Sequence, residues 1–449
     1  MWLAWTLACS DPVGPPSDAA PREVPWDRRL PALGDGPRGT VALRSIVHLH
    51  SPWSHDACDG DPQPDGVVNE PCLQDLRAAL CDVRVDVAFV TDHPAEAAFQ
   101  PYEDLVHHRD GDAWAEVDGV RVGNRIACDD GHVVTWLPGI EDELMPLSLD
   151  RQVAGDDTAE NDRLYNSYDA EALDAEEAAG AVVFVAHTEQ RALADLERLQ
   201  DAGLAGVEVF NLHAMFAPDI RESALGLDPL GWTSDVAPFT SPDGTGEPDL
   251  MMLGVLQPQP PSLASWDALL ARGPMAGVAG TDAHQNVLPI ALRDGERGDS
   301  YRRMLRWFSN VLLADGEGPS EAQAAVAGGR SYVAFEVLGT PVGFDFRLEA
   351  DGEVWEMGSE APEGTLVVDC PTLHPESPRG PEAPEIAVRV YKDGVVWHEG
   401  CGELPTDGPG AYRAEVEVVP RHLRPFLGDD PEPWMRPFPW IYGNAIRVR

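Results

Sequence analysis

The sequence predicts a mixed α/β domain followed by an all-β domain, and three features of the chain support this prediction. From about residue 41 to about residue 330, apolar segments typical of buried strands alternate with segments typical of helices. After about residue 330, the chain consists of short alternating segments separated by Gly, Pro and Asp. Several predicted strands of the first part end in His, Asp or Glu. The first two features indicate the fold, and the third indicates where its chemistry lies.

Residues 1–40 are expected to lie outside the fold. A short apolar run ends at Cys9 and is followed by a Pro-, Ala- and Asp-rich stretch without hydrophobic periodicity. This pattern resembles a bacterial lipoprotein leader and its tether, although it lacks a basic start and its apolar run is short. The alternative is a disordered tail with a chance cysteine. We therefore expect an exported cell-envelope lipoprotein, periplasmic or on the outer surface, whose membrane contact is an N-terminal lipid anchor.

Residues 41–338 are predicted to form the α/β domain. The expected strands span 41–50, 85–93, 132–141, 181–187, 205–211 and 275–284. The expected helices span 71–82, 170–180 and 191–203. The first of these helices begins with Pro and the second closes with Gly, as helix ends favour. Alternation of this kind predicts a mostly parallel sheet or barrel flanked by helices.

Residues 339–449 are predicted to form a β-sandwich. Segments such as "PVGFDFRLEA", "TLVVDC" and "YRAEVEVV" alternate polar and apolar residues, as half-buried strands do. The stretch "YKDGVV" is a hairpin signal because Asp-Gly favours a tight two-residue turn. The number and spacing of these segments are typical of a sandwich.

The charge of the chain excludes one class of partner. The sequence holds 77 acidic and 32 basic residues, for a net charge of −45, and Lys392 is its single lysine. A field of this sign repels the phosphate backbone, so we expect no nucleic-acid partner. No apolar stretch after the leader approaches the roughly 18 residues that a membrane helix needs.

The cysteines indicate an oxidising compartment. Without Cys9, six of the seven cysteines remain, an even number that suits an exported chain. Cys370 and Cys401 are candidates for a pair within the C-terminal domain, and the other pairings stay open. Cysteine metal ligands are disfavoured because no C-x-x-C motif occurs.

The ends of five predicted strands carry candidate metal ligands. These residues are His48, His50, Asp92, His93, Glu141, His187, Asp282 and His284. Each alone is more often a hydrogen-bonded loop residue than a ligand, but parallel α/β folds place their active sites at this edge. Side chains two positions apart on a strand share a face about 6 to 7 Å apart, so two imidazoles can reach one ion. A donor set of His and carboxylate without Cys suits Zn²⁺, Mn²⁺ or Fe²⁺.

The motifs "HLHSPWSHDACDG", "AFVTDH", "GIE", "VVFVAHTE" and "AGTDAH" occur in that order and resemble the PHP (polymerase and histidinol phosphatase) family over roughly residues 41–340. The resemblance implies a distorted (β/α)₇ barrel with two or three divalent ions that hydrolyses phosphoesters. It also implies that the metal ligands are His48, His50, Asp56, His93, Glu141, His187, Asp282 and His284. Glu141 would bridge two ions, and His55 competes with Asp56 for its place.

Two departures from the family pattern bear on the number of ions. Residues 142–186 contain no histidine, where the family usually supplies one. Gln152, Glu143 or His132 would have to stand in, or one ion is lost. Thr188 also stands where the family commonly has proline. The β-sandwich and the ending "WIYGNAIRVR" resemble an exported branch of the family that includes carbamate and aryl-ester hydrolases.

The expected function is a metal-dependent hydrolase of a small-molecule ester, with a phosphoester favoured. We expect a hydroxide bridging two ions as the nucleophile, with Glu141, Asp282 and His187 as the catalytic residues of the cluster. One alternative is a carboxylic- or carbamate-ester hydrolase with an apolar pocket. The other is a non-catalytic binding protein with a degenerate site.

Further candidates surround the expected cluster. The possible phosphate clamps are Arg293, Arg302, Arg303 and Arg306, each more often a solvated or paired residue. The possible apolar lining is Trp53, Trp136 and Phe216, for which core packing is the default. Weaker pocket candidates are Glu208, Asn211 and His213, while His107 and His108 are expected at the surface.

Overall fold

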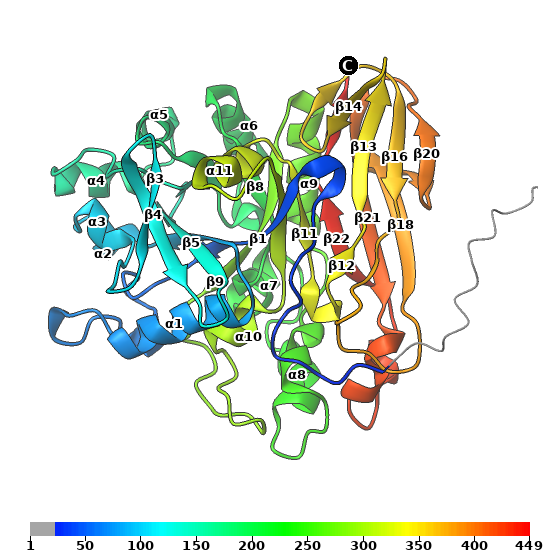
Figure 1. Ribbon diagram of the computed structural model, residues 1–449, viewed down its shortest axis with the longest axis horizontal. Coiled ribbons are helices and arrows are strands. Elements are labelled where there is room, and N and C mark those ends of the chain that lie inside the picture. Colours follow the sequence, from blue (N-terminus) through cyan, green and yellow to red (C-terminus); the bar gives the residue numbers. More distant parts are fainter. Residues whose placement is uncertain (1–22) are drawn as a thin grey trace, which may run out of the picture.

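The computed structural model describes residues 23–449 and shows a mixed α/β part beside a strand-rich C-terminal part (Figure 1). The apolar run and Cys9 of the expected leader lie outside the described residues. In residues 23–449, no helix is both long and apolar enough to cross a bilayer. The α/β class and the strand-rich C-terminal region agree with the sequence-based expectation.

A run of parallel strands forms the centre of the α/β part. Its members are β1 (Val41–Leu49), β2 (Val87–Asp92), β5 (Val133–Ile140), β7 (Val182–Val185), β8 (Gly206–Asn211) and β9 (Ala276–Ala283). They pair in the order β7-β8-β9-β1-β2-β5. Parallel strands in a row bring their carboxyl ends to one edge. All six strands were predicted.

Antiparallel strands pair with both edge strands of this run and with the first half of β1. They are β3 (Ala113–Val117), β4 (Val120–Ala127), β6 (Met145–Leu147) and β10 (Ser309–Ala314). The hairpin β3-β4 pairs with the first half of β5, β6 pairs with β7, and β10 pairs with the first half of β1. The second half of β5 meets the segment after β6 where Leu149 N–H donates to Pro138 O at 2.8 Å. One such bond does not define a strand ladder, so the (β/α)₇ barrel stays a prediction.

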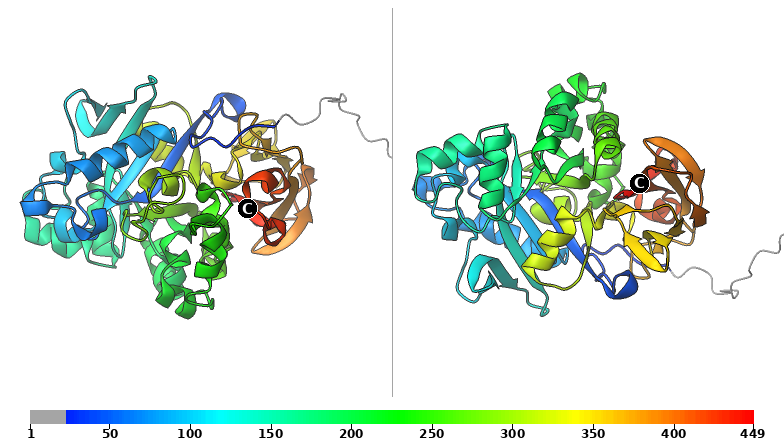
Figure 2. Two further views of the ribbon diagram at one scale, coloured as in Figure 1. Left: turned by 90° about the horizontal axis from the view of Figure 1, so that it is seen from below. Right: turned by 90° about the horizontal axis from the view of Figure 1, so that it is seen from above.

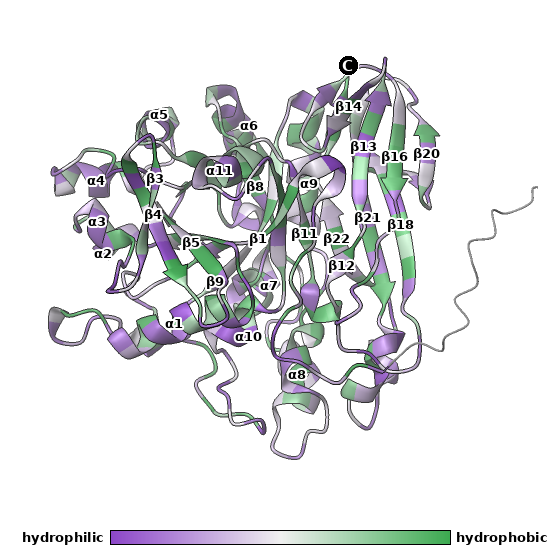
Figure 3. Cartoon of the chain, in the orientation of Figure 1, coloured by the Kyte–Doolittle hydropathy of each residue, from purple (hydrophilic) through white to green (hydrophobic). Residues whose placement is uncertain are grey.

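Helices cover the outside of the strands (Figures 1 and 2). They are α1 (Glu70–Asp82), α2 (Pro94–Ala97), α3 (Tyr102–Leu105), α4 (Thr158–Tyr165), α5 (Ala170–Ala178), α6 (Leu193–Ala202), α7 (Pro218–Ser223), α8 (Trp232–Thr240), α9 (Pro260–Arg272), α10 (Tyr301–Leu305) and α11 (Pro319–Ala327). The Asn69 side chain caps α1 by accepting from Cys72 N–H. The same helix buries Leu73, Leu76 and Leu80, which lie three and four positions apart and so share one face. Figure 3 shows hydrophilic residues on the outward surfaces of α1 and α4.

The C-terminal part contains two larger antiparallel sheets and the short antiparallel pair β12-β17. Its strands are β11 (Ser331–Ala334), β12 (Pro341–Val342), β13 (Asp345–Ala350), β14 (Glu353–Glu356), β15 (Glu360–Ala361), β16 (Thr365–Asp369), β17 (Thr372–Leu373), β18 (Glu385–Lys392), β19 (Val395–Glu399), β20 (Gly402–Pro405), β21 (Gly410–Val419), β22 (Phe438–Gly443) and β23 (Ile446–Val448). One sheet has the order β14-β13-β16-β20, and the other contains β19-β18-β21-β22. Phe346 and Leu348 of the first sheet belong to the same hydrophobic core as Val388 and Val416 of the second.

The second sheet is joined to the α/β part by backbone hydrogen bonds. β22 pairs with β11, β11 pairs with β10, and β10 pairs with β1. The division into domains 41–338 and 339–449 therefore stays a prediction, because the sheet crosses the expected boundary. The predicted hairpin is present at Asp393 and Gly394, which adopt φ of 51° and 77°.

Residues 23–40 correct the expectation of a disordered tether over residues 1–40. Val24 exchanges backbone hydrogen bonds with Arg379, and Trp26 Nε1–H donates to Asp249 Oδ2 at 3.0 Å. Leu30 is buried in the core. For these residues the tether prediction is wrong, because the apolar side chains in this Pro-rich stretch are sufficient to hold it on the body.

Three disulfides pair the six cysteines of the described chain. Cys370–Cys401 confirms the expected candidate pair. The other two are Cys58–Cys72 and Cys81–Cys128. Both of these attach a neighbouring segment to α1, one at each end of the helix.

Candidate metal centre

The eight predicted ligands lie together at the carboxyl edge of the parallel strands. Each has a ligand atom within 4.0 Å of a ligand atom of another member. They come from β1 and the loop after it, and from the ends of β2, β5, β7 and β9. Parallel pairing of these strands is what brings together residues up to 236 positions apart, from His48 to His284.

The inner group consists of His48, His50, Glu141, His187 and Asp282. Asp282 Oδ1 lies 3.6 Å from His48 Nε2 and 3.5 Å from His50 Nε2. Glu141 Oε2 lies 3.8 Å from His48 Nε2, and Glu141 Oε1 lies 3.4 Å from His187 Nε2. The two carboxylates thus share His48 and His187, because Asp282 Oδ2 also lies 3.5 Å from His187 Nε2, while His50 faces Asp282.

The outer group consists of Asp56, His93 and His284. Asp56 Oδ1 lies 3.3 Å from His284 Nε2 and 3.6 Å from His93 Nε2, and these two nitrogens are 3.4 Å apart. His93 Nδ1 also lies 3.0 Å from Glu141 Oε2, which connects the two groups. His55, the competitor for the place of Asp56, is exposed and faces Glu96 at 3.7 Å.

A bulge in β1 aims His48 at the cluster. The register of β1 against both β2 and β9 shifts between Val47 and Leu49, and His48 adopts a φ of 59°. His187 and Asp282 also have positive φ values, of 51° and 50°. Such values are unfavourable for residues with a side chain and persist where the surrounding structure imposes them. Three inner ligands therefore have backbones arranged to point their side chains inward.

Two buried groups orient the histidines of β1. Glu208 Oε1 lies 2.7 Å from His48 Nδ1, and its other oxygen accepts from His187 N–H at 2.8 Å and from Asn211 Nδ2 at 3.0 Å. His50 Nδ1 lies 2.8 Å from Ser54 Oγ. Both contacts use Nδ1 and leave Nε2 facing the cluster, which is how metal-binding histidines are commonly oriented.

Asp92 holds the loop after β1 in place and is not part of either ligand group. Its carboxylate accepts from Ser51 N–H, from Ser51 Oγ and from Ser54 Oγ at 2.7 to 2.9 Å. Burial raises its pKa to about 6, against these hydrogen bonds. Ser51 Oγ also lies 2.8 Å from Nε2 of His107, which is buried. The expectation that His107 lies at the surface is therefore wrong, because it packs under this loop.

Against burial, carboxylates of the cluster raise the pKa of His48, His93 and His187, whereas burial lowers the pKa of His50 and of His284. Burial by itself lowers the pKa of His48, but its carboxylate neighbours, first of all Asp282, outweigh burial and raise it to about 9. The pKa of His93 rises to about 9 in the same way, against burial and chiefly through Glu141. Burial opposes the ionisation of Glu141 and Asp282, yet the imidazoles hold both pKa values well below their usual range. A divalent cation bound to these nitrogens would displace the protons and supply the balancing charge.

The cluster also contains polar atoms that are buried without a hydrogen-bond partner. They are His48 Nε2, His50 Nε2, Asp56 Oδ1 and His187 Nδ1. Such atoms are costly unless a partner is supplied, and the first three face other ligand atoms of the cluster, while His187 Nδ1 lies 3.6 Å from Glu189 Oε1. The described residues therefore fit divalent ions with nitrogen and oxygen ligands, such as Zn²⁺, Mn²⁺ or Fe²⁺.

The residues suggested as stand-ins for the missing histidine lie elsewhere. Gln152 donates to Ala97 O and Gln100 O, and Glu143 pairs with Arg191. His132 lies near Val85 O, at the start of β5 and so at the opposite end of that strand. His213 lies nearer, with Nδ1 4.0 Å from Asp282 Oδ2, and is half exposed.

Most of the residues expected to bind substrate instead contact other parts of the protein. Arg302, Arg303 and Arg306 face the buried carboxylate of Asp249, and Arg293 donates to backbone carbonyls of Gly244 and Gly246. Trp136 is fully buried. Phe216 packs against Trp232 and Trp307, and Trp53 Nε1–H donates to Asp104 O. Neither an arginine clamp nor an aromatic lining is formed by these candidates.

Comparisons with known proteins place few constraints on this chain. No protein-family model matches it, and no curated protein does. Among solved structures it is similar to a two-domain protein containing a predicted PHP-like metal-dependent phosphoesterase from Bacteroides vulgatus. The identity is 10%, the TM-score is 0.37, and the match covers 95% of this chain and 98% of that chain. A likeness of this size does not assign the chain to the family.

Proposed function

We propose that the protein is a metal-dependent hydrolase of the PHP type that cleaves a small-molecule ester, with a phosphoester favoured. The observation that supports this proposal is the convergence of six strand-end residues, His50 and Asp56 into one largely buried cluster of imidazoles and carboxylates. Such a set would hold two or three divalent ions. When bound, such ions activate water as a nucleophile and stabilise developing negative charge.

The residues of the cluster and Glu208 would have different roles in this function. The inner group would hold the ions between its two carboxylates, and Glu141 would connect it with the outer group through His93. Glu208 keeps His48 Nε2 directed inward by accepting from Nδ1–H. His187 and His93 are the more exposed imidazoles of the cluster, with about a fifth of each side chain exposed, and mark the side from which substrate enters.

A carboxylic or carbamate ester is the second candidate substrate. Three of the four arginines considered as phosphate clamps are engaged with the buried Asp249, and the exposed Arg293 donates to backbone carbonyls, so the charge of a phosphate group would fall to the ions and not to these arginines. The surrounding chain is strongly acidic, with a net charge of −45, and repels a dianion at long range. A neutral ester meets neither difficulty.

The test combines metal analysis with two substrate panels. Protein loaded with Zn²⁺, Mn²⁺ or Fe²⁺ should retain at least two ions per chain after gel filtration. Phosphate release from a phosphomonoester and phosphodiester panel supports the favoured function, while hydrolysis confined to a carboxylic and carbamate ester panel supports the second candidate. Fewer than one ion per chain under every metal supply would refute the hydrolase and leave a binding role.

We further propose that the protein is exported and works at the cell envelope. Three disulfides among the described residues support an oxidising compartment. A lipid on Cys9 would provide the anchor, and mass spectrometry of the protein from its native membrane would detect it.

A further inference from the structure

Asp56 is the ligand of the outer group whose position depends on a loop. His93 and His284 directly follow β2 and β9, and the pairing of those strands places them. Asp56 lies in the connection between β1 and α1, and 39% of its side chain is exposed. Whatever holds this loop therefore decides whether the outer group is complete.

The loop is attached to the strand end that carries His284. Cys58 N–H donates to His284 O, and Asp59 N–H donates to Gln285 O, both at 3.0 Å. Asn286 Nδ2 donates to Asp56 O at 2.9 Å. Cys58 and Asp59 adopt φ values of 57° and 61°, which are unfavourable for residues with a side chain. These three hydrogen bonds, together with the ion pair of Asp59 with Arg297 at 2.8 Å, thus have to hold a backbone that is locally strained.

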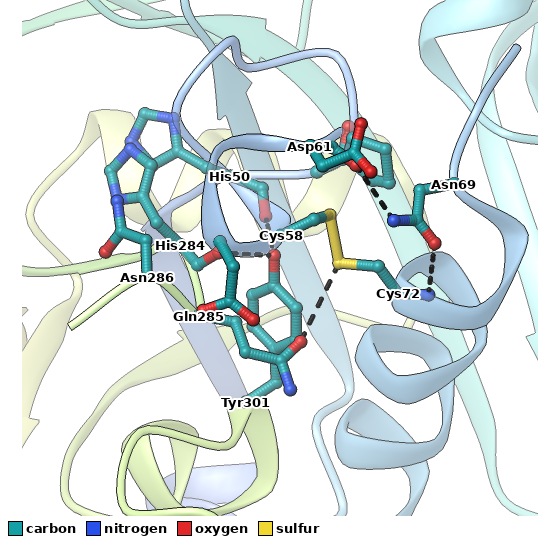
Figure 4. Close-up of a disulfide and its surroundings, with 12 residues drawn as sticks. His50, Cys58, Asp61, Asn69, Cys72, His284, Gln285, Asn286 and Tyr301 are labelled. Atoms are coloured by element: carbon teal, nitrogen blue, oxygen red, sulfur yellow. Dashed lines mark hydrogen bonds between the residues drawn. A yellow bond between two sulfur atoms is a disulfide. The ribbon is translucent and has the colours of Figure 1, made fainter. Parts of the chain in front are cut away.

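The Cys58–Cys72 disulfide adds a covalent attachment at the same point (Figure 4). It joins the loop two residues after Asp56 to the first turn of α1, and both half-cystines are buried. Cys72 Sγ lies 3.7 Å from Gln285 Oε1, so the disulfide packs directly under the segment after His284. Tyr301 OH lies 3.0 Å from His50 O and 3.3 Å from His284 O on the same side.

Helix α1, to which the disulfide attaches the loop, is itself held in the core. It buries three leucines in the core, and the Cys81–Cys128 disulfide fastens its other end. Without the Cys58–Cys72 bond, the loop would be connected to α1 through residues 59–70, most of which are exposed. Exposed segments with few buried contacts open at low free-energy cost.

We propose that the Cys58–Cys72 disulfide is a positioning element of the metal centre that holds Asp56 against His93 and His284. The outer group then binds its ion tightly only while this disulfide is formed, whereas the inner group, which contains no residue of this loop beyond His50, binds independently of it. The proposal rests on the proposed metal-dependent function and adds a covalent positioning element to the same site.

The test compares two disulfide deletions of the same helix. The C58A/C72A variant is expected to bind one ion fewer per chain than the native protein, or to bind that ion about 10- to 100-fold more weakly, as changes around metal ligands commonly do. The matched control, C81A/C128A, removes the disulfide at the other end of α1 and should keep the native number of ions. Metal content is measured after loading with Zn²⁺ or Mn²⁺ and gel filtration.

Two further measurements separate positioning from general destabilisation. The D56N variant, with its disulfides intact, should lose the same ion, and combining it with C58A/C72A should remove no further ion. Hydrogen exchange of residues 51–60 in metal-free protein should be faster in C58A/C72A than in C81A/C128A. If C58A/C72A does not fold, C58V/C72A restores apolar volume without the covalent bond and takes its place.

The outcomes distinguish this proposal from the proposed function. Native metal content and native exchange in C58A/C72A would overturn the positioning role and leave the hydrolase in place. Equal losses of metal in both disulfide variants would also overturn it. A native protein that binds no ion would refute the proposed function, and with it the role of the disulfide in metal binding.

Discussion

Gly280 provides the space that Glu208 needs beside His48. Gly280 lies on β9 opposite Asn211 of β8 and Val47 of β1. A Cβ added at Gly280 would lie 1.8 Å from Glu208 Oε1 and 3.1 Å from His48 Cβ. The Gly280→Ala variant therefore cannot form without displacing the carboxylate that orients His48.

The size of the effect follows from this overlap. A retreat of roughly 1.5 Å by the carboxylate would break its contact with His48 Nδ1, since hydrogen bonds weaken beyond about 3.2 Å. Loss of such an orienting partner costs about 10- to 100-fold in metal affinity, or about 1.4 to 2.7 kcal/mol. Overpacking adds a loss of about 1 to 3 kcal/mol in the free energy of unfolding.

The assay needs a control that is overpacked on the same strand without touching the cluster. Gly277→Ala, on the same strand, would place its Cβ 2.8 Å from the Trp266 ring and 2.9 Å from Val209 Cγ1. Both variants should lose stability in chemical denaturation, but only Gly280→Ala should lose metal affinity in a competition titration with a chelating dye. Native affinity in Gly280→Ala, or an equal loss in Gly277→Ala, would refute the role given to Glu208.

Three other changes test the site and the core. His48→Ala should abolish turnover while circular dichroism and the melting temperature stay near native, and substantial remaining activity would refute the site. Burial lowers the pKa of His422 to about 4, so the unfolded chain binds more protons between pH 6.5 and 4, and the stability of the folded chain falls as the pH falls through this window. The stability advantage of the native protein over His422→Gln should therefore shrink by about 3 kcal/mol from pH 7 to pH 4 in urea titrations, and a constant difference would contradict this. Asp249→Asn should cost about 3 to 5 kcal/mol at pH 7 because it leaves Arg302 and Arg303 buried without their shared carboxylate, and a loss below 1 kcal/mol would show that the arginines find other partners.

Much of the α/β order and the place of the ligands could be predicted from local patterns. Apolar runs that end in His, Asp or Glu place those residues at strand ends, and parallel pairing then brings the ends together. Helix α1 was recognisable from Pro71 and a repeating apolar face, and the hairpin from Asp393 and Gly394. These features depend on residues close together in the sequence.

Features that depend on distant contacts were not predictable. The bulge at His48 is seen in the pairing of β1 with both β2 and β9. No residue type near His48 in the sequence predicts it. His107 looked like a surface residue because its burial depends on Ser51, which is 56 positions away. The sequence shows that Cys58 and Cys72 are present. Their pairing could not be predicted because it depends on how the loop and α1 lie relative to each other in the fold.

Strands β1, β10, β11 and β22 are paired in one continuous series, which affects how the protein unfolds. A chain cut after residue 338 would leave β11 as an open sheet edge, and such edges pair with other molecules and aggregate. The sandwich therefore covers this edge, both halves should melt in one cooperative transition, and loss of the sandwich would expose the metal-bearing half to misassembly.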